Sequence, residues 1–179
     1  MKLEQLSLNQ KIFKESEKAV LSKIYDNETN ITILKRKLDN QVTNSAENIL
    51  KNNPELNFSK VVNYNNVQEI LHNNFRSETD FQPLFQDISK VIMMFSNLFK
   101  VKNVWLRLDA IDGPMCPRFH VDNVKCRLVS TYFGPGTEWL PNALVERDKL
   151  GHGNNGELDE DSGLFLKQTD IRQLEVGDL

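Results

Sequence analysis

The chain has 179 residues, a net charge of −3, 39% hydrophobic residues and 26% charged residues. This length is that of one ordinary domain with a proper core, and this composition excludes a disordered chain and a membrane-spanning one. No basic cluster is larger than Lys35-Arg36-Lys37, which excludes the electrostatic surface of a nucleic-acid-binding protein, so we expect no nucleic-acid partner.

The N-terminal segment is predicted to lie at the periphery. Residues 1–22 carry scattered apolar positions among charges, which indicates a weakly helical arm in front of a single α+β domain over residues 23–179. Met1–Gln10 lacks the basic start and apolar run of a signal peptide, which predicts a cytoplasmic protein without a membrane partner. Asn30–Leu34 is short and β-branched, and predicts the first strand.

Three helices are predicted in the middle of the chain. Asn44–Lys51 and Asn66–Phe75 each show helical spacing after a capping residue. The third begins after Thr79, which forms a capping box with Gln82, and tolerates Pro83 in its first turn. Its apolar residues recur at steps of three and four, which predicts the core side of a helix: Phe81, Leu84, Phe85, Ile88, Val91, Ile92, Phe95, Leu98 and Phe99.

Strands are predicted after Val101, where the apolar period changes to two. Val104, Leu106, Leu108 and Ala110 share one face, and Trp105, Arg107 and Asp109 share the other. Turns at Gly113-Pro114 and Gly134-Pro135-Gly136 flank a second strand, Arg118–Phe133, and short strands are expected at Leu164–Lys167 and from Leu174 to Val176. The order predicts an α+β fold with N-terminal helices packed on an antiparallel sheet or small barrel.

His120 and Asp122 are the strongest candidates for metal ligands. Two residues apart on a predicted strand, they project from the same face. An imidazole nitrogen beside a carboxylate oxygen is two-thirds of the triad that holds ferrous iron in oxygenases, and a third ligand would be required. The competing interpretation is a hydrogen-bonded surface pair.

Other polar residues crowd the same stretch. Arg107 and Asp109 are either site-lining groups or members of a salt-bridge network between strands. Cys116 and Cys126 form a Cys-x3-His-x5-Cys spacing with His120 that suits zinc but matches no common zinc-finger spacing, so idle thiols are the competing interpretation. Arg118 and Arg127 also lie nearby in the sequence.

The remaining histidines are predicted to have no site role. His152 lies in a glycine-rich segment followed by the acidic run Glu157–Asp161, which is typical of a solvated loop. His72 lies among helical residues and is expected at the surface.

The stretch that carries these residues resembles a bacterial family catalogued as domain of unknown function 1826. The resemblance is carried by Arg107-Leu108-Asp109, by Cys116-Pro117-Arg118-Phe119-His120-Val121-Asp122, and by the segment from Arg127 to Leu140. Members of that family occur in zinc-responsive gene neighbourhoods beside metal-handling GTPases, so the resemblance implies a role in zinc homeostasis without specifying a reaction.

The same stretch also looks like the first half of a double-stranded β-helix of the iron- and 2-oxoglutarate-dependent oxygenases. In these enzymes a His-x-Asp pair is followed by a late His and an Arg, and Val176-Gly177-Asp178-Leu179 resembles the turn before that His. The resemblance implies a complete or partial β-helix and a chain that is incomplete at its C-terminus, with the third ligand beyond Leu179.

Taken together, the sequence predicts a metal-binding α+β protein with His120 and Asp122 as ligands and Fe(II) or Zn(II) as the ion. In the oxygenase interpretation 2-oxoglutarate is the co-substrate, and the partner is a small molecule. The alternatives are a non-catalytic zinc accessory protein that uses His120 with Cys116 and Cys126, and a structural or interaction domain. Whether the chain is an enzyme stays open.

Overall fold

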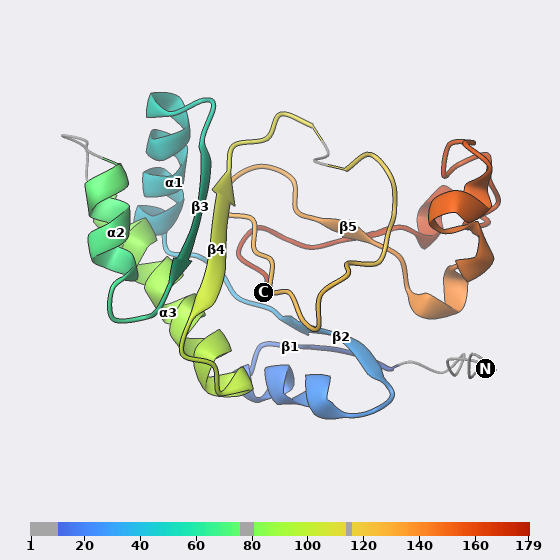
Figure 1. The fold of residues 1–179 in the computed structure, drawn as a ribbon, viewed down its shortest axis with the longest axis horizontal. Helices are drawn as coiled ribbons and strands as arrows, with labels where there is room; N and C mark the ends of the chain where they lie inside the picture. Colours follow the sequence, from blue (N-terminus) through green and yellow to red (C-terminus); the bar gives the residue numbers. More distant parts are fainter. Residues whose placement is uncertain (1–10, 76–80, 114–115) are drawn as a thin grey trace. The chain divides into compact units, whose positions relative to one another are not determined.

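The structure, a computed structural model, describes residues 11–75, 81–113 and 116–179. Within these residues the chain forms two compact units, each with its own elements (Figure 1). The first unit takes in the segments Met1–Arg36, Cys116–Thr131 and Pro135–Leu179, and the second takes in Lys37–Met115 and Tyr132–Gly134. No helix in these described ranges is both long and apolar enough to span a membrane.

In the second unit, the helices α1 (Asn40–Asn52), α2 (Val67–Asn74) and α3 (Gln82–Phe99) pack on the antiparallel strands β3 (Asn57–Val62) and β4 (Val104–Asp109) (Figure 1). The three predicted helices are therefore confirmed. The α1 helix is stabilised at its start because the Asp39 carboxylate accepts a hydrogen bond from the Gln41 N–H, at 2.8 Å. Pro83 occupies the first turn of α3, as expected.

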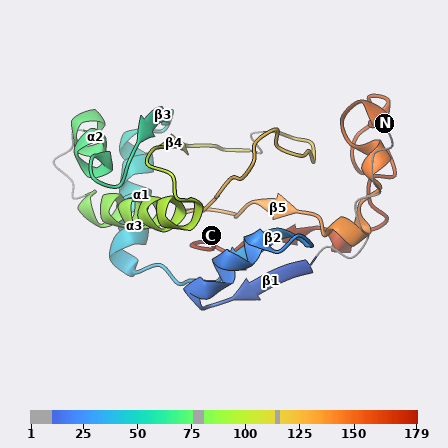
Figure 2. The ribbon, with the colours of Figure 1, turned by 60° about the horizontal axis from the view of Figure 1, so that its bottom comes forward.

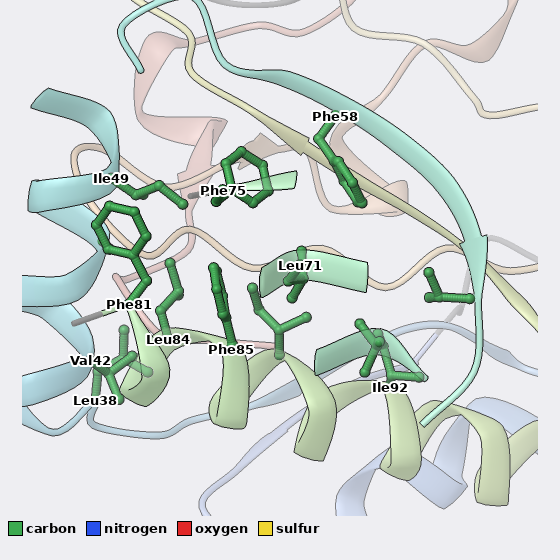
Figure 3. Packing of buried hydrophobic residues seen from close by; sticks show 14 residues of the cluster. Leu38, Val42, Ile49, Phe58, Leu71, Phe75, Phe81, Leu84, Phe85 and Ile92 are labelled. Carbon is green, nitrogen blue, oxygen red and sulfur yellow. The ribbon is translucent and has the colours of Figure 1, made fainter. Parts of the chain in front are cut away.

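The apolar stripe of α3 lines the core of this unit. Phe85 is 0% exposed and its ring meets the rings of Phe75 and Phe81, with centroids 6.1 and 6.0 Å apart (Figure 3). The core interpretation is confirmed from Phe81 to Ile92. Beyond it Phe95 and Phe99 are only half-buried, and their rings pack together at 4.6 Å.

Strand β4 presents the two faces that the alternation predicts. Val104, Leu106 and Leu108 pack against the core, whereas Trp105 is 77% exposed. Its partner β3 was not predicted from the sequence. In the observed register Phe58 of β3 pairs with Leu108.

In the first unit, strands β1 (Lys11–Glu15) and β2 (Thr29–Leu34) lie side by side and parallel (Figure 2). Parallel neighbours need a crossover, which the 3₁₀ helix η1 (Lys18–Tyr25) provides. The predicted strand at Asn30–Leu34 is confirmed. The weakly helical arm is wrong for Lys11–Glu15, where strand pairing with β2 prevails, and residues 1–10 of that arm lie outside the described residues.

The C-terminal residues are bound to the end of β2. Leu34 and Leu179 exchange two backbone hydrogen bonds, 2.9 and 3.1 Å long. Next to them the Lys35 ammonium lies 2.8 Å from the Asp178 carboxylate and 2.7 Å from that of Glu175, and the Asp178 side chain is only 2% exposed. An ion pair between a partly exposed lysine and a buried aspartate thus joins these two distant segments of the chain.

A short antiparallel pair, β5 (Glu138–Trp139) with β6 (Arg172–Gln173), completes the first unit. Between these strands the chain runs through the 3₁₀ turns η2 (Asn142–Leu144), η3 (Arg147–Lys149), η4 (Gly151–Asn154) and η5 (Gln168–Asp170). Gly136 precedes β5, and a Cβ there would come within 2.1 Å of the Leu174 carbonyl oxygen. Only glycine therefore fits beside the Leu174 carbonyl.

The predicted strand Arg118–Phe133 is wrong, because these residues have no strand partner. Their backbone groups are bound elsewhere: the Phe119 N–H bonds to the Asp159 carboxylate, and the Thr131 carbonyl accepts from the Gly177 N–H. The chain is extended in places but bends at residues 123–125. Burial still alternates from Cys126 to Ser130. The alternation in the sequence therefore reflects an extended backbone that is not part of a sheet.

The last two strands predicted from the sequence are also placed wrongly. Leu164–Lys167 forms no strand; Leu164 and Phe165 are buried in a turn region instead. The strand expected from Leu174 to Val176 lies two residues earlier, as β6. The α+β class is confirmed. The sheets of the described residues are two-stranded, and the double-stranded β-helix stays a prediction. The capping residue Thr79 and the Pro114 of the predicted turn lie outside the described residues.

Candidate functional site

His120 and Asp122 face each other although no strand holds them. The Nε2 atom of His120 lies 3.5 Å from Oδ1 of Asp122. The His120 side chain is 50% exposed and that of Asp122 is 32% exposed, so the pair is open to solvent. Local bonds rather than a sheet must therefore fix the two side chains.

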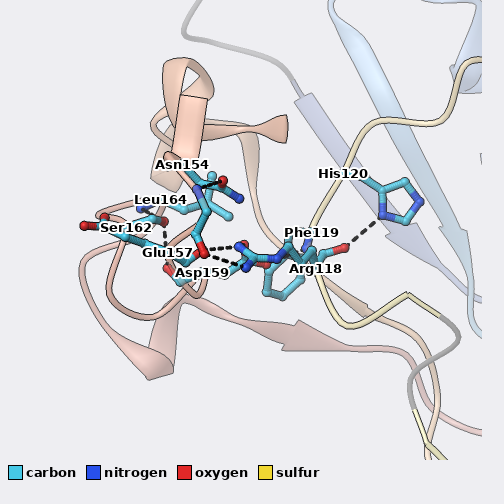
Figure 4. A network of polar contacts seen from close by, with 9 residues as sticks. Arg118, Phe119, His120, Asn154, Glu157, Asp159, Ser162 and Leu164 are labelled. Carbon is cyan, nitrogen blue, oxygen red and sulfur yellow. Dashed lines mark hydrogen bonds and ion pairs between the residues drawn. The ribbon is translucent and has the colours of Figure 1, made fainter. Parts of the chain in front are cut away.

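The hydrogen bond of His120 decides which ring nitrogen is free. Its Nδ1 lies 2.9 Å from the Arg118 carbonyl oxygen, which can only accept, so Nδ1 carries the hydrogen (Figure 4). In the neutral ring Nε2 then has a lone pair, and this atom lies 3.5 Å from Oδ1 of Asp122. Two acceptors at this distance are favourable neighbours only when a proton or a metal ion lies between them.

Arg127 orients the Asp122 carboxylate. Its Nε forms an ion pair with Oδ2 of Asp122 at 3.1 Å, and the other carboxylate oxygen, Oδ1, is the one that lies 3.5 Å from His120. Ligating side chains are commonly oriented by partners on their far side; here His120 is hydrogen-bonded to the Arg118 carbonyl and Asp122 forms an ion pair with Arg127. The pair is thus supported on both sides.

The separation of the two acceptor atoms can be compared with the distance between two ligand atoms of one ion. Ligands about 2.0–2.2 Å from zinc lie about 3.4 Å apart at the tetrahedral angle, but only about 3.0 Å apart at a right angle. The 3.5 Å between Nε2 of His120 and Oδ1 of Asp122 is nearer to the first value. Two side chains supply only part of a coordination shell, and the exposed side of the pair leaves room for further ligands.

The thiols of Cys116 and Cys126 are free. Cys116 is exposed, and burial raises the pKa of the Cys126 thiol above its ordinary value, although a backbone interaction with Arg127 opposes the shift. A raised pKa disfavours the thiolate form, which is the form that binds metal. No group of three or more His, Cys, Asp or Glu side chains is arranged to hold an ion in the described part of the chain.

Arg118 points away from His120 and is bound by the loop that follows η4. Its guanidinium donates to the carbonyl oxygens of Glu157 and Gly156 and lies 3.7 Å from Oδ1 of Asp159 (Figure 4). The Phe119 N–H donates to Oδ2 of the same carboxylate at 2.6 Å. The side chain of Asp159 is only 9% exposed. Arg118 is therefore a supporting residue rather than a ligand.

Arg107 and Asp109 form an ion pair within β4, in the second unit. The Arg107 Nε lies 2.6 Å from Oδ2 of Asp109, and two residues apart on one strand they share a face. The Asp109 side chain is 10% exposed, and its buried Oδ1 has no hydrogen-bond partner among the described residues.

A known protein family matches most of this chain. A family described as "Protein of unknown function (DUF1826)" matches residues 15–179. The chain belongs to this family. The match covers both units and includes every candidate site residue. No curated protein and no solved structure matches the chain. Membership of the DUF1826 family therefore supplies no reaction, and the chemistry has to be argued from the side chains.

Two supporting residues were not selected from the sequence. Arg127 was noted only as a neighbour, and Asp159 was part of an acidic run interpreted as solvated. Within that run Asp159 is nearly buried while Glu157, Glu160 and Asp161 are exposed. The available signal is the apolar pair Leu164-Phe165 just after the run, because buried apolar residues there require the loop to fold back.

Proposed function

We propose that this member of the DUF1826 family binds a divalent transition metal ion through Nε2 of His120 and Oδ1 of Asp122, with zinc preferred. The observation that carries the proposal is that Nε2 of His120, the ring nitrogen not bonded to the Arg118 carbonyl, lies 3.5 Å from a carboxylate oxygen of Asp122. An ion in this gap replaces an unfavourable contact between two acceptors by two coordinate bonds.

The choice of zinc rests on the separation of the ligand atoms, which fits tetrahedral better than octahedral coordination. Ferrous iron with 2-oxoglutarate is the alternative that the oxygenase resemblance brings, and it requires a third protein ligand in an octahedral arrangement. The thiol alternative, with Cys126 as ligand, is disfavoured by the raised pKa of that thiol.

Zinc and ferrous iron are titrated by calorimetry into the metal-free protein under reducing conditions, for the natural sequence, His120→Ala and Asp122→Asn. Removing either ligand is expected to weaken zinc binding by about tenfold or more. His152→Ala is the matched control, because His152 is also an exposed histidine of the first unit. Equal zinc affinity in the natural protein and His120→Ala would overturn the proposal, and tighter binding of iron would favour the oxygenase alternative.

A further inference from the structure

The segment before His120 is fixed by one nearly buried carboxylate. Oδ2 of Asp159 accepts a hydrogen bond from the Phe119 N–H, at 2.6 Å. Its Oδ1 forms an ion pair with the Arg118 guanidinium, at 3.7 Å. Its side chain is 9% exposed. A carboxylate in such a position binds its partners strongly, since charged hydrogen bonds gain strength when water is excluded.

The loop that carries Asp159 is itself held in shape. The buried Asn154 side chain accepts a hydrogen bond from the Gly156 N–H, at 2.9 Å, and the Ser162 hydroxyl donates to the Asp159 carbonyl, at 3.2 Å (Figure 4). Asn155 and Gly156 adopt positive φ angles of 54° and 85°. The carbonyls of residues 156 and 157 are thereby turned to the Arg118 guanidinium.

A ring contact anchors the same segment on its other side. The rings of Phe119 and Phe165 meet nearly edge to face, with centroids 6.1 Å apart and an angle of 82°. Phe165 is buried. The backbone of Arg118 and Phe119 is therefore held by a hydrogen bond, an ion pair and an aromatic contact, all to residues 156–165.

The carbonyl of Arg118 is the group that selects the ring form of His120, because it receives the Nδ1 hydrogen. We propose that Asp159 is a positioning residue: it fixes the backbone at Arg118 and Phe119, and so keeps the His120 imidazole with Nδ1 protonated and Nε2 free. Its consequence for zinc affinity rests on the proposed function. The loop that contains Asp159 thus forms the outer support of the candidate metal site.

The direct test is the ring form of His120 in the metal-free protein. A long-range proton–nitrogen correlation spectrum, recorded at a pH where the ring is neutral, is compared for the natural sequence, Asp159→Ala, Asp159→Asn and the control Asp161→Ala. Asp161 is an exposed aspartate of the same acidic run. We expect Nδ1 protonation in the natural protein and in the control, and a mixture of both ring forms in Asp159→Ala.

Asp159→Asn separates positioning from loss of the fold, because its amide oxygen still accepts the Phe119 N–H while its charge for Arg118 is lost. We expect this variant to fall between the natural protein and Asp159→Ala. Zinc affinity should follow the same order, with a loss of about tenfold in Asp159→Ala.

The outcomes distinguish the two proposals. A changed ring form in Asp159→Ala with no zinc binding by any variant would support the positioning role and sink the metal site. An unchanged ring form in both Asp159 variants would overturn the positioning role, even if His120→Ala abolishes zinc binding.

Discussion

The Nε2 atom of His120 lies 3.5 Å from Oδ1 of Asp122, and neither atom has a hydrogen to offer when the ring is neutral. The Arg118 carbonyl accepts a hydrogen bond from Nδ1, and Arg127 forms an ion pair with the other carboxylate oxygen of Asp122. The two acceptor atoms therefore lie side by side. This arrangement is the basis of the proposed metal site.

The thiols should not contribute to that site. Because burial raises the pKa of the Cys126 thiol, Cys126→Ser is expected to leave the zinc affinity unchanged, whereas His120→Ala weakens it. Competition of each variant against a coloured zinc chelator measures this order. The reverse order would show that zinc is held by sulfur, as in the accessory-protein alternative.

The core of the second unit should depend on Phe85 more than on Phe95. Phe85 is fully buried and Phe95 only half-buried, so Phe85→Ala leaves the larger cavity. We expect Phe85→Ala to lower the free energy of unfolding by about 3–5 kcal/mol and Phe95→Ala by less. Urea unfolding followed by circular dichroism measures both, and an equal or larger loss in Phe95→Ala would contradict the assignment of the core.

Close backbone approach at Gly136 should make this position intolerant of a side chain. A Cβ there would meet the Leu174 carbonyl at 2.1 Å, so Gly136→Ala is expected to cost about 1–3 kcal/mol. Gly113→Ala is the control, because among the described residues no atom beyond its chain neighbours lies within 4 Å of its Cβ position, and a change within about 0.5 kcal/mol is expected. Thermal unfolding gives the midpoint temperature of both variants. Equal midpoints would show that the Leu174 carbonyl is not packed against Gly136.

The ion pair of Lys35 should give stability that disappears at alkaline pH. Burial alone would lower the pKa of the Lys35 ammonium, but the carboxylates of Asp178 and Glu175 outweigh it and hold this pKa above the ordinary 10.5. A raised folded-state pKa stabilises the protein fully below the unfolded value, and this stability is lost as pH rises through the folded value. The advantage of the natural protein over Lys35→Met should thus hold below pH 10.5 and shrink above it.

At neutral pH, Lys35→Met leaves the nearly buried Asp178 without its cation. A loss of about 3 kcal/mol is expected, at the low end for a broken buried pair because Lys35 is partly exposed. Changing Asp178 to Asn in the same protein should recover much of that loss. Stability that is independent of the Lys35 substitution at every pH would show that the pair does not hold the C-terminal segment.

Periodicity predicted the helices well and the strands poorly, for a physical reason. A helix closes its hydrogen bonds locally, so the spacing of apolar residues from Phe81 to Ile92 was enough to identify α3 and its buried face. A strand needs a partner elsewhere in the chain. Residues 118–133 alternate like a strand but find side-chain acceptors and turns instead, and β3 pairs with β4 although its own pattern is weak.

The sequence predicted only part of the candidate site, for the same reason. His120 and Asp122 were selected because a step of two puts side chains on one face, and they do converge, but bonds from Arg118 and Arg127 hold them rather than a strand. Asp159 lies about forty residues away in sequence, and only the folded loop brings it to Phe119. Supporting residues of this kind carry no local pattern.

The most direct test of the central claim is X-ray absorption at the zinc edge of the zinc-loaded protein. If His120 and Asp122 hold the ion, the spectrum shows one imidazole and oxygen neighbours at about 2.0–2.2 Å and no sulfur, and the imidazole signal is lost in His120→Ala. A sulfur neighbour at about 2.3 Å, or an imidazole signal that persists in His120→Ala, would contradict the account.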